Sequence, residues 1–187
     1  MTSRLLAYRP EMEVPLPAAA LPLQSEDELA LATQLLEAPG PGHVDAFLVR
    51  LLAVTGDGRQ LRGTPLERPL RQLLGQALAP LLPLHGATPQ HLRHVARIFG
   101  MELEGLSPED KEFELARRVV QLICAVNATL ARQLAAGGGP AQKVAAALLQ
   151  EARTLAPGLL RHAAQASRLP AGGRWRREGG HIVVSDC

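Results

Sequence analysis

Three histidines lie close together in the sequence, at positions 85, 91 and 94. His91 and His94 are three residues apart on a predicted helix, so they share a face, and His85 belongs to the loop before that helix. Three imidazoles can bind Zn²⁺. The segment has no HExxH pattern and no carboxylate beside the histidines, so we expect solvated or capping side chains, with no metal and no other cofactor.

Six carboxylates lie between residues 102 and 114. Paired carboxylates can perform acid–base catalysis or bind a cation. Several of these fall in the first turn of a predicted helix, where the helix dipole favours negative charge, so a catalytic role is not needed to explain them. Ser25 and Ser107 are expected helix caps, the chain has no GxSxG, P-loop or GxGxxG motif, and we expect no catalytic residue. The six are Glu102, Glu104, Glu109, Asp110, Glu112 and Glu114.

A basic and aromatic patch near the C-terminus is the predicted interaction site. Such a patch can bind phosphate while an indole stacks on a base. The β-branched run after it predicts a β-hairpin instead, and Trp175 with Ile182 or Val184 would anchor this hairpin on the helices. We therefore expect a protein partner and not nucleic acid. The patch consists of Arg174, Trp175, Arg176 and Arg177.

The composition is that of a globular helical domain. Of 187 residues, 47% are hydrophobic and 20% charged, which excludes a wholly disordered chain. Aromatic residues make up only 3%, so Leu, Ala and Val must build the core. The net charge of +2 is too small to require nucleic acid as a partner. We expect Cys124 to be a buried apolar side chain and Cys187 an exposed thiol, since two cysteines make no disulfide scaffold.

Prolines, glycines and capping residues divide the chain. The prediction is a mainly α fold: a small multi-helix bundle (25–170) with one long helix, an extended Pro-rich N-terminal arm (1–24) and a C-terminal β-hairpin (171–187). The capping box at Ser25 and the Ser107-Pro108 start are the clearest helix signals. Residues 55–58 are predicted to form a turn and 59–63 a loop. The predicted helices are 25–36, 44–54, 65–79, 89–99, 108–135, 140–155 and a short one within 159–167.

Two features bear on membranes and interfaces. Residues 72–92 carry no formal charge, but Pro80, Pro83 and Pro89 interrupt them, so we expect a buried helix and loop over a membrane-inserting segment. Asn127 interrupts the apolar face of the long helix; it either bonds a neighbouring turn in the core, which we favour, or sets register at an interface. The chain shows no signal peptide and no run of about 18 apolar residues, so we expect a cytoplasmic protein unless a dedicated machine exports it.

Two segments resemble a group of uncharacterised proteins of GC-rich bacteria. One is FGMELEGLSPEDKEFELARRVVQL, residues 99–122, and the other is GRWRREGGHIVV, residues 173–184. The group also has segments similar to Leu35-Leu36-Glu37 and Phe47-Leu48. Its middle is often Gly-rich, whereas residues 72–92 here carry Leu and Pro. The resemblance covers about half of the chain and implies no activity and no catalytic residue.

The leading functional hypothesis is a bacterial helical protein that acts by protein–protein contact or as a homo-oligomer, as an accessory or cargo of a larger assembly. One alternative is a membrane-active or secreted effector that uses residues 72–92. The other is a metal-dependent hydrolase with its metal at His85, His91 and His94.

Overall fold

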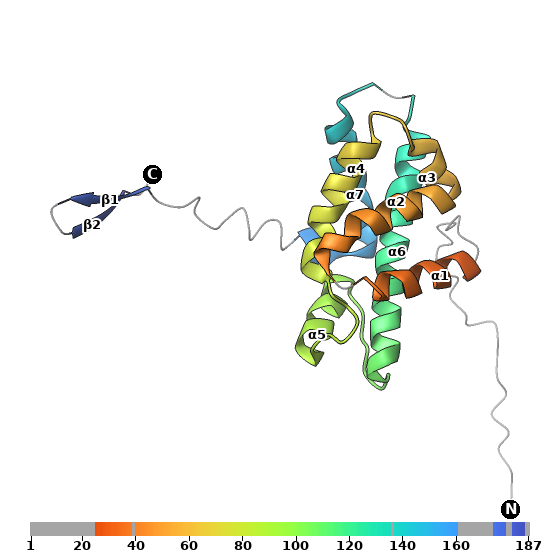
Figure 1. Ribbon diagram of the computed structural model, residues 1–187, viewed down its shortest axis with the longest axis horizontal. Coiled ribbons are helices and arrows are strands. Elements are labelled where there is room, and N and C mark those ends of the chain that lie inside the picture. Colours follow the sequence, from red (N-terminus) through yellow and green to blue (C-terminus); the bar gives the residue numbers. More distant parts are fainter. Residues whose placement is uncertain (1–24, 39, 136, 161–173, 179–180, 186–187) are drawn as a thin grey trace, which may run out of the picture.

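The computed structural model describes residues 25–38, 40–135, 137–160, 174–178 and 181–185. Helices dominate these residues, which confirms the mainly α prediction (Figure 1). They are α1 (Ser25–Leu36), α2 (Val44–Val54), α3 (Gly56–Leu61), α4 (Glu67–Leu78), α5 (Pro89–Ile98), α6 (Pro108–Arg132) and α7 (Pro140–Leu155), with the short 3-10 helices η2 (Pro41–His43) and η3 (Ala79–Leu81).

Helix α6 is the central element of the domain. Its 25 residues rise about 37 Å at 1.5 Å per residue, enough to pass through the whole bundle (Figure 1). Helices α1, α3, α5 and α7 all contact it, while α4 packs on α2 and α7. As predicted, the core is aliphatic. Many of its fully buried large side chains are leucines, among them those at positions 35, 48, 51, 52, 61, 70, 74, 78, 81, 84, 115 and 122.

The predicted starts of α5 and α6 are confirmed, with their capping chemistry. The Thr88 side chain accepts a hydrogen bond from the His91 N–H at 3.2 Å. The Ser107 hydroxyl accepts from the Asp110 N–H at 3.1 Å and donates to the Asp110 carboxylate at 2.8 Å. After α5, Gly100 takes a positive φ of 65°, and the Met101 N–H closes the helix end on the Ala96 carbonyl at 2.9 Å.

The predictions of a turn over residues 55–58 and a loop over 59–63 were wrong for residues 56–61, which form helix α3. Two glycines in six residues lower helix propensity, but local bonding and packing outweigh that cost. The Thr55 side chain accepts from the Gly58 N–H at 3.2 Å, and Leu61 is fully buried. Helix α3 thereby packs on α2 and α6.

Two helix boundaries also differ from the prediction. Helix α6 ends at Arg132 and not near residue 135. Helix α4 begins at Glu67 and not at Pro65, and the Glu67 carboxylate accepts a hydrogen bond from the Gly63 N–H at 2.7 Å. Glu67 therefore reaches back as expected of a capping glutamate, but to a residue one position before Thr64.

The uncharged residues 72–92 form the end of α4, η3, a loop and the start of α5. Leu74, Leu78, Leu81 and Leu84 in this segment are buried, in agreement with the predicted buried helix and loop. Among the described residues, no helix has the length and apolar character needed to span a membrane.

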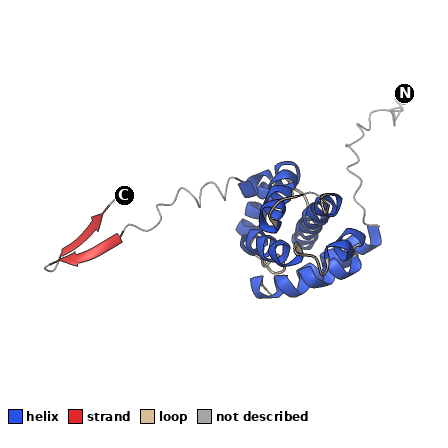
Figure 2. Ribbon diagram, turned by 90° about the horizontal axis from the view of Figure 1, so that it is seen from above, coloured by secondary structure: helices blue, strands red, loops and turns tan. Residues whose placement is uncertain are grey.

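Strands β1 (Arg174–Glu178) and β2 (His181–Ser185) pair antiparallel, with Trp175 opposite Val184 and Arg177 opposite Ile182. Figure 2 shows the two strands side by side. Their side chains are outside the described part of the chain, so the packing of Trp175 on the helices stays a prediction. The arm 1–24 and the predicted short helix after residue 160 also fall outside the described residues.

A substitution at Gly58 tests how closely α3 approaches α2. A Cβ atom at Gly58 would lie 2.7 Å from the Leu52 Cα and 2.3 Å from the Thr55 Oγ1. We expect Gly58→Ala to lower the free energy of unfolding by about 1–3 kcal/mol in urea denaturation, as overpacking does. Gly56→Ala, on the same helix with nothing within 4 Å of its Cβ, is the control and should raise it by up to about 1 kcal/mol. Equal effects of the two changes would contradict the packing of α3.

Candidate interaction site

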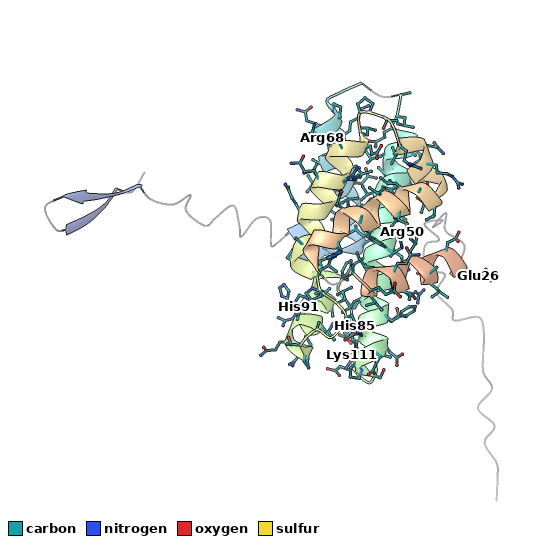
Figure 3. All side chains as sticks on the ribbon, viewed as in Figure 1. Glu26, Arg50, Arg68, His85, His91 and Lys111 are labelled. Carbon is teal, nitrogen blue, oxygen red and sulfur yellow. The ribbon has the colours of Figure 1, made fainter. Side chains whose placement is uncertain are left out.

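A groove runs between α5, the connection after it and the start of α6. Its volume is about 690 Å³, within the range of about 300–1,000 Å³ usual for ligand pockets. The groove is lined by Ala87, Pro89, Leu92, Arg93, Ala96, Arg97, Met101, Glu102, Leu103, Glu104, Pro108 and Lys111. Figure 3 shows Lys111 on the first turns of α6, at the same end of the molecule as His85 and His91.

The connection after α5 alternates between apolar and acidic residues. Gly100 turns the chain away from α5, so that Leu103 is buried and Met101 is half-buried. Glu102, which lies between these two residues, and Glu104, which follows Leu103, are exposed. Two residues after Glu104, Leu106 is 39% exposed. The groove thus has an apolar floor and a charged rim.

The cations of the rim are not neutralised within the part of the chain that the structure describes. The Arg93 Nε donates to the Pro89 carbonyl at 3.2 Å, and the Arg97 Nε donates to the Arg93 carbonyl at 3.4 Å. These bonds leave the outer nitrogens of both guanidinium groups unused. Neither arginine nor Lys111 forms an ion pair with a described carboxylate.

A second hollow shows the contrast. It has a volume of about 600 Å³ and lies beside Asp45, Glu67, Arg68 and Arg71. Arg71 bonds Asp45 through two nitrogens and lies 3.8 Å from a Glu67 oxygen. The hydrogen bond from Arg71 lowers the pKa of Asp45. Here Arg71 and the two carboxylates satisfy one another, and among these four side chains only Arg68 forms no ion pair with a described carboxylate.

Glu112 fixes the loop that leads into α5. Its Oε1 accepts from the Gly86 N–H at 3.0 Å, and its Oε2 lies 3.0 Å from the His85 Nδ1. The side chain of Glu112 is buried, whereas His85 is largely exposed. One α6 carboxylate therefore holds the loop by backbone and side chain together, and with it the start of the helix that forms one side of the groove.

The three histidines do not form a metal site. His85 bonds Glu112, and the His91 Nε2 lies 3.1 Å from the Leu81 carbonyl oxygen. His94 is half-buried and takes part in an interaction of its own. Within the described ranges, no group of three His, Cys, Asp or Glu side chains could hold a metal ion. Of the two expected roles, solvated or capping, His91 fits the second, since its ring lies beside the carbonyl of the last residue of η3 and so connects α5 to η3.

The six predicted acidic residues divide into separate structural tasks. Asp110 caps α6 with Ser107, Glu112 holds the loop, and Glu114 accepts from Arg117 at 2.8 Å. Glu102 and Glu104 line the groove. Helix capping and contacts thus explain Asp110, Glu112 and Glu114, and Glu109 lies exposed in the first turn of α6, where the helix dipole favours negative charge. Sequence reasoning missed Arg93, Arg97 and Met101, although two arginines one turn apart on an amphipathic helix were a visible signal.

Glu28 has a partner that its position in the sequence did not indicate. Its Oε1 accepts from the Arg117 Nε at 3.0 Å and from the Gln121 Nε2 at 2.9 Å. These bonds join α1 to α6 across 89 and 93 residues of sequence. The capping box that Glu28 was expected to form with Ser25 stays a prediction, because the contacts of Ser25 lie outside what the structure describes.

Cys124 is buried as predicted, and burial, with Glu28 and Asp57 adding to it, raises the pKa of its thiol to about 12. At neutral pH this thiol is therefore an unreactive apolar group.

Asn127 lies in the core, 1% exposed, on the buried middle of α6. The predicted bond to a neighbouring turn is wrong, since neither its Nδ2 nor its Oδ1 has a hydrogen-bond partner in the described structure. A buried amide without partners costs free energy, about 1–3 kcal/mol for each unsatisfied group.

The predicted interaction residues Arg174, Trp175, Arg176 and Arg177 lie together on β1. None of the residues lining the groove comes from this strand. Their role as an interaction surface stays a prediction, because their side chains are outside the described part.

The comparisons with known proteins return no relative: no family model, no curated protein and no solved structure matches the chain. The resemblance to proteins of GC-rich bacteria therefore stays a prediction.

Glu112→Ala tests the connection between α6 and the loop. We expect the free energy of unfolding to fall by about 1–2 kcal/mol, because the change removes two hydrogen bonds to a charged acceptor, one of them from an exposed histidine. Glu109→Ala, an exposed carboxylate on the first turn of the same helix, should change it by no more than about 0.5 kcal/mol. Urea denaturation of both variants measures the difference, and equal small effects would contradict the role of Glu112.

Asn127→Leu should raise the free energy of unfolding by about 1–3 kcal/mol, because leucine has a similar branched shape and buries no polar atom. Thr129→Val is the matched control on the same helix. The Thr129 hydroxyl donates to Glu151 at 2.6 Å and accepts from Arg132 at 2.8 Å, so its removal should destabilise the domain. Thermal and urea unfolding of the two variants should therefore shift in opposite directions. A loss of stability in Asn127→Leu would show that the amide has a partner.

Proposed function

We propose that this chain is a helical binding module that acts by protein–protein contact, as an accessory or cargo component of a larger assembly, with the groove beside α5 as its binding surface. The observation that carries the proposal is the combination of an apolar floor with rim cations that no described carboxylate pairs. Interface centres are commonly apolar and their rims charged, and Arg and Met are enriched at them.

The support comes from three properties of the groove. Its floor contains Met101, whose flexible thioether side chain adapts to different partners. Leu106, two residues after the lining residue Glu104, is also exposed. All of the lining residues from Met101 to Lys111 lie in residues 99–122, one of the two segments that resemble the bacterial group. A partner bound in the groove would cover its exposed apolar surface and could pair with Arg93 and Arg97.

Met101→Asp tests the proposal. Peptides selected from a display library by binding to the full chain should lose at least about tenfold affinity for Met101→Asp, since burying an unpaired carboxylate in an apolar floor is costly. Leu149→Asp is the control, because Leu149 is 47% exposed on α7 and lies outside the groove. Isothermal titration calorimetry measures both, and circular dichroism verifies that the variants fold. Selected peptides that bind Met101→Asp as well as the parent chain would contradict the proposed binding surface.

A further inference from the structure

The groove carries opposite charges on its two sides. Arg93 and Arg97 lie along α5, and Glu102 and Glu104 lie along the connection that follows. Lys111 lies on α6. Because no ion pair joins these arginines to these glutamates, each side offers its charge to a ligand.

Each charged row consists of two residues that are close in the sequence. Arg93 and Arg97 are four residues apart on a helix, a rise of about 6 Å. Glu102 and Glu104 are both exposed, with the buried Leu103 between them. The edges of an amphipathic helix also carry residues one turn apart, at positions i and i+4. One helix lying in the groove can therefore present such a pair to the arginines on one edge and charges to the glutamates on the other.

We propose that the groove binds an amphipathic α-helix of a protein partner whose apolar stripe has an acidic edge on one side and a basic edge on the other. The apolar stripe covers Leu92, Ala96 and Met101, the acidic edge faces Arg93 and Arg97, and the basic edge faces Glu102 and Glu104. The proposal rests on the proposed function and specifies the ligand of the same surface. It follows the helix-in-groove mode of recognition, in which residues at i, i+3, i+4 and i+7 are the anchors.

The charged edges determine the direction of the bound helix. Turning the helix end for end exchanges its two edges and places like charges against each side of the groove. Single exposed ion pairs contribute little, about 0–1 kcal/mol each, but juxtaposed like charges add a penalty, so one direction is preferred. The apolar floor supplies affinity and the rim supplies orientation.

Two other ligands fit the charges less well. An extended peptide that carries only carboxylates would place some of them beside Glu102 and Glu104, where like charges repel. An anionic membrane surface would meet the same two glutamates. A helix with one acidic and one basic edge avoids both conflicts.

The test uses the full chain and three synthetic helical peptides that share one Leu/Ala stripe. The first has one edge of Glu and one of Lys, the second has Glu on both edges, and the third has Lys on both. We expect the first to bind at least about tenfold more tightly than the others in calorimetry at low salt. Vesicles of an anionic phospholipid form a fourth arm, for which we expect weaker binding than for the first peptide.

Charge reversal supplies the second measurement. Arg93→Glu with Arg97→Glu should weaken the first peptide about tenfold and make the all-Lys peptide the preferred ligand. The control is Arg59→Glu with Arg62→Glu, two exposed arginines on and beside α3 that change the net charge equally. This control should leave the order of affinities unchanged.

The outcomes separate this inference from the proposed function. If all three peptides bind with equal affinity and Met101→Asp abolishes the binding of each, the inference about charged edges is wrong but the proposed binding surface is supported. Peptide binding that Met101→Asp does not weaken would overturn both. Preference for the all-Glu peptide or for the vesicles over the first peptide, or no binding of the first peptide, would overturn the inference.

Discussion

The domain depends on the burial of a broad face of one helix. Between Leu115 and Leu130 most residues of α6 are buried, and α1, α3, α5 and α7 pack on it. The remaining stripe, at helical spacing, is partly buried or exposed and includes Arg117, Arg118 and Gln121. Polar side chains beside the buried face need partners, and Glu28 bonds Arg117 while Thr129 bonds Glu151. Among the described residues, Asn127 is an exception, with both amide atoms buried and unpaired.

The sequence predicted the helices well where local chemistry marks their ends. Thr88-Pro89 and Ser107-Pro108 begin helices because a side-chain oxygen and a proline suit the first turn whatever surrounds them. Helix α3 was missed because its glycines resemble a turn locally. Only the approach of Gly58 to the backbone of Leu52 shows why a residue without a side chain is needed inside a helix.

The candidate site was less predictable, because its contacts also join residues that are far apart in the sequence. The sequence pattern located six carboxylates but not their partners, and those partners lie elsewhere in the chain: Glu112 meets a loop 26 residues earlier, and Glu28 meets α6 89 residues later. The groove is formed by α5, its following connection and the start of α6. Its residues looked unremarkable separately, since arginines on an amphipathic helix and alternating Met-Glu-Leu-Glu are both compatible with a plain solvent-exposed surface. Their juxtaposition is what gives an apolar floor with opposite charges on its two sides.

The stability of the core and the shape of the groove meet at Glu112. This residue belongs to the central helix, yet its carboxylate is bonded to Gly86 and His85, in the loop that continues into α5. The His91 ring then connects α5 back to the Leu81 carbonyl of η3. The α5 side of the groove is thus held from two elements whose own leucines are buried in the core. A binding surface built in this way keeps its shape before a partner arrives, so binding does not have to order the wall that carries Arg93 and Arg97. The side chains of these arginines remain to be ordered, and a matching acidic edge supplies the interaction that orders them.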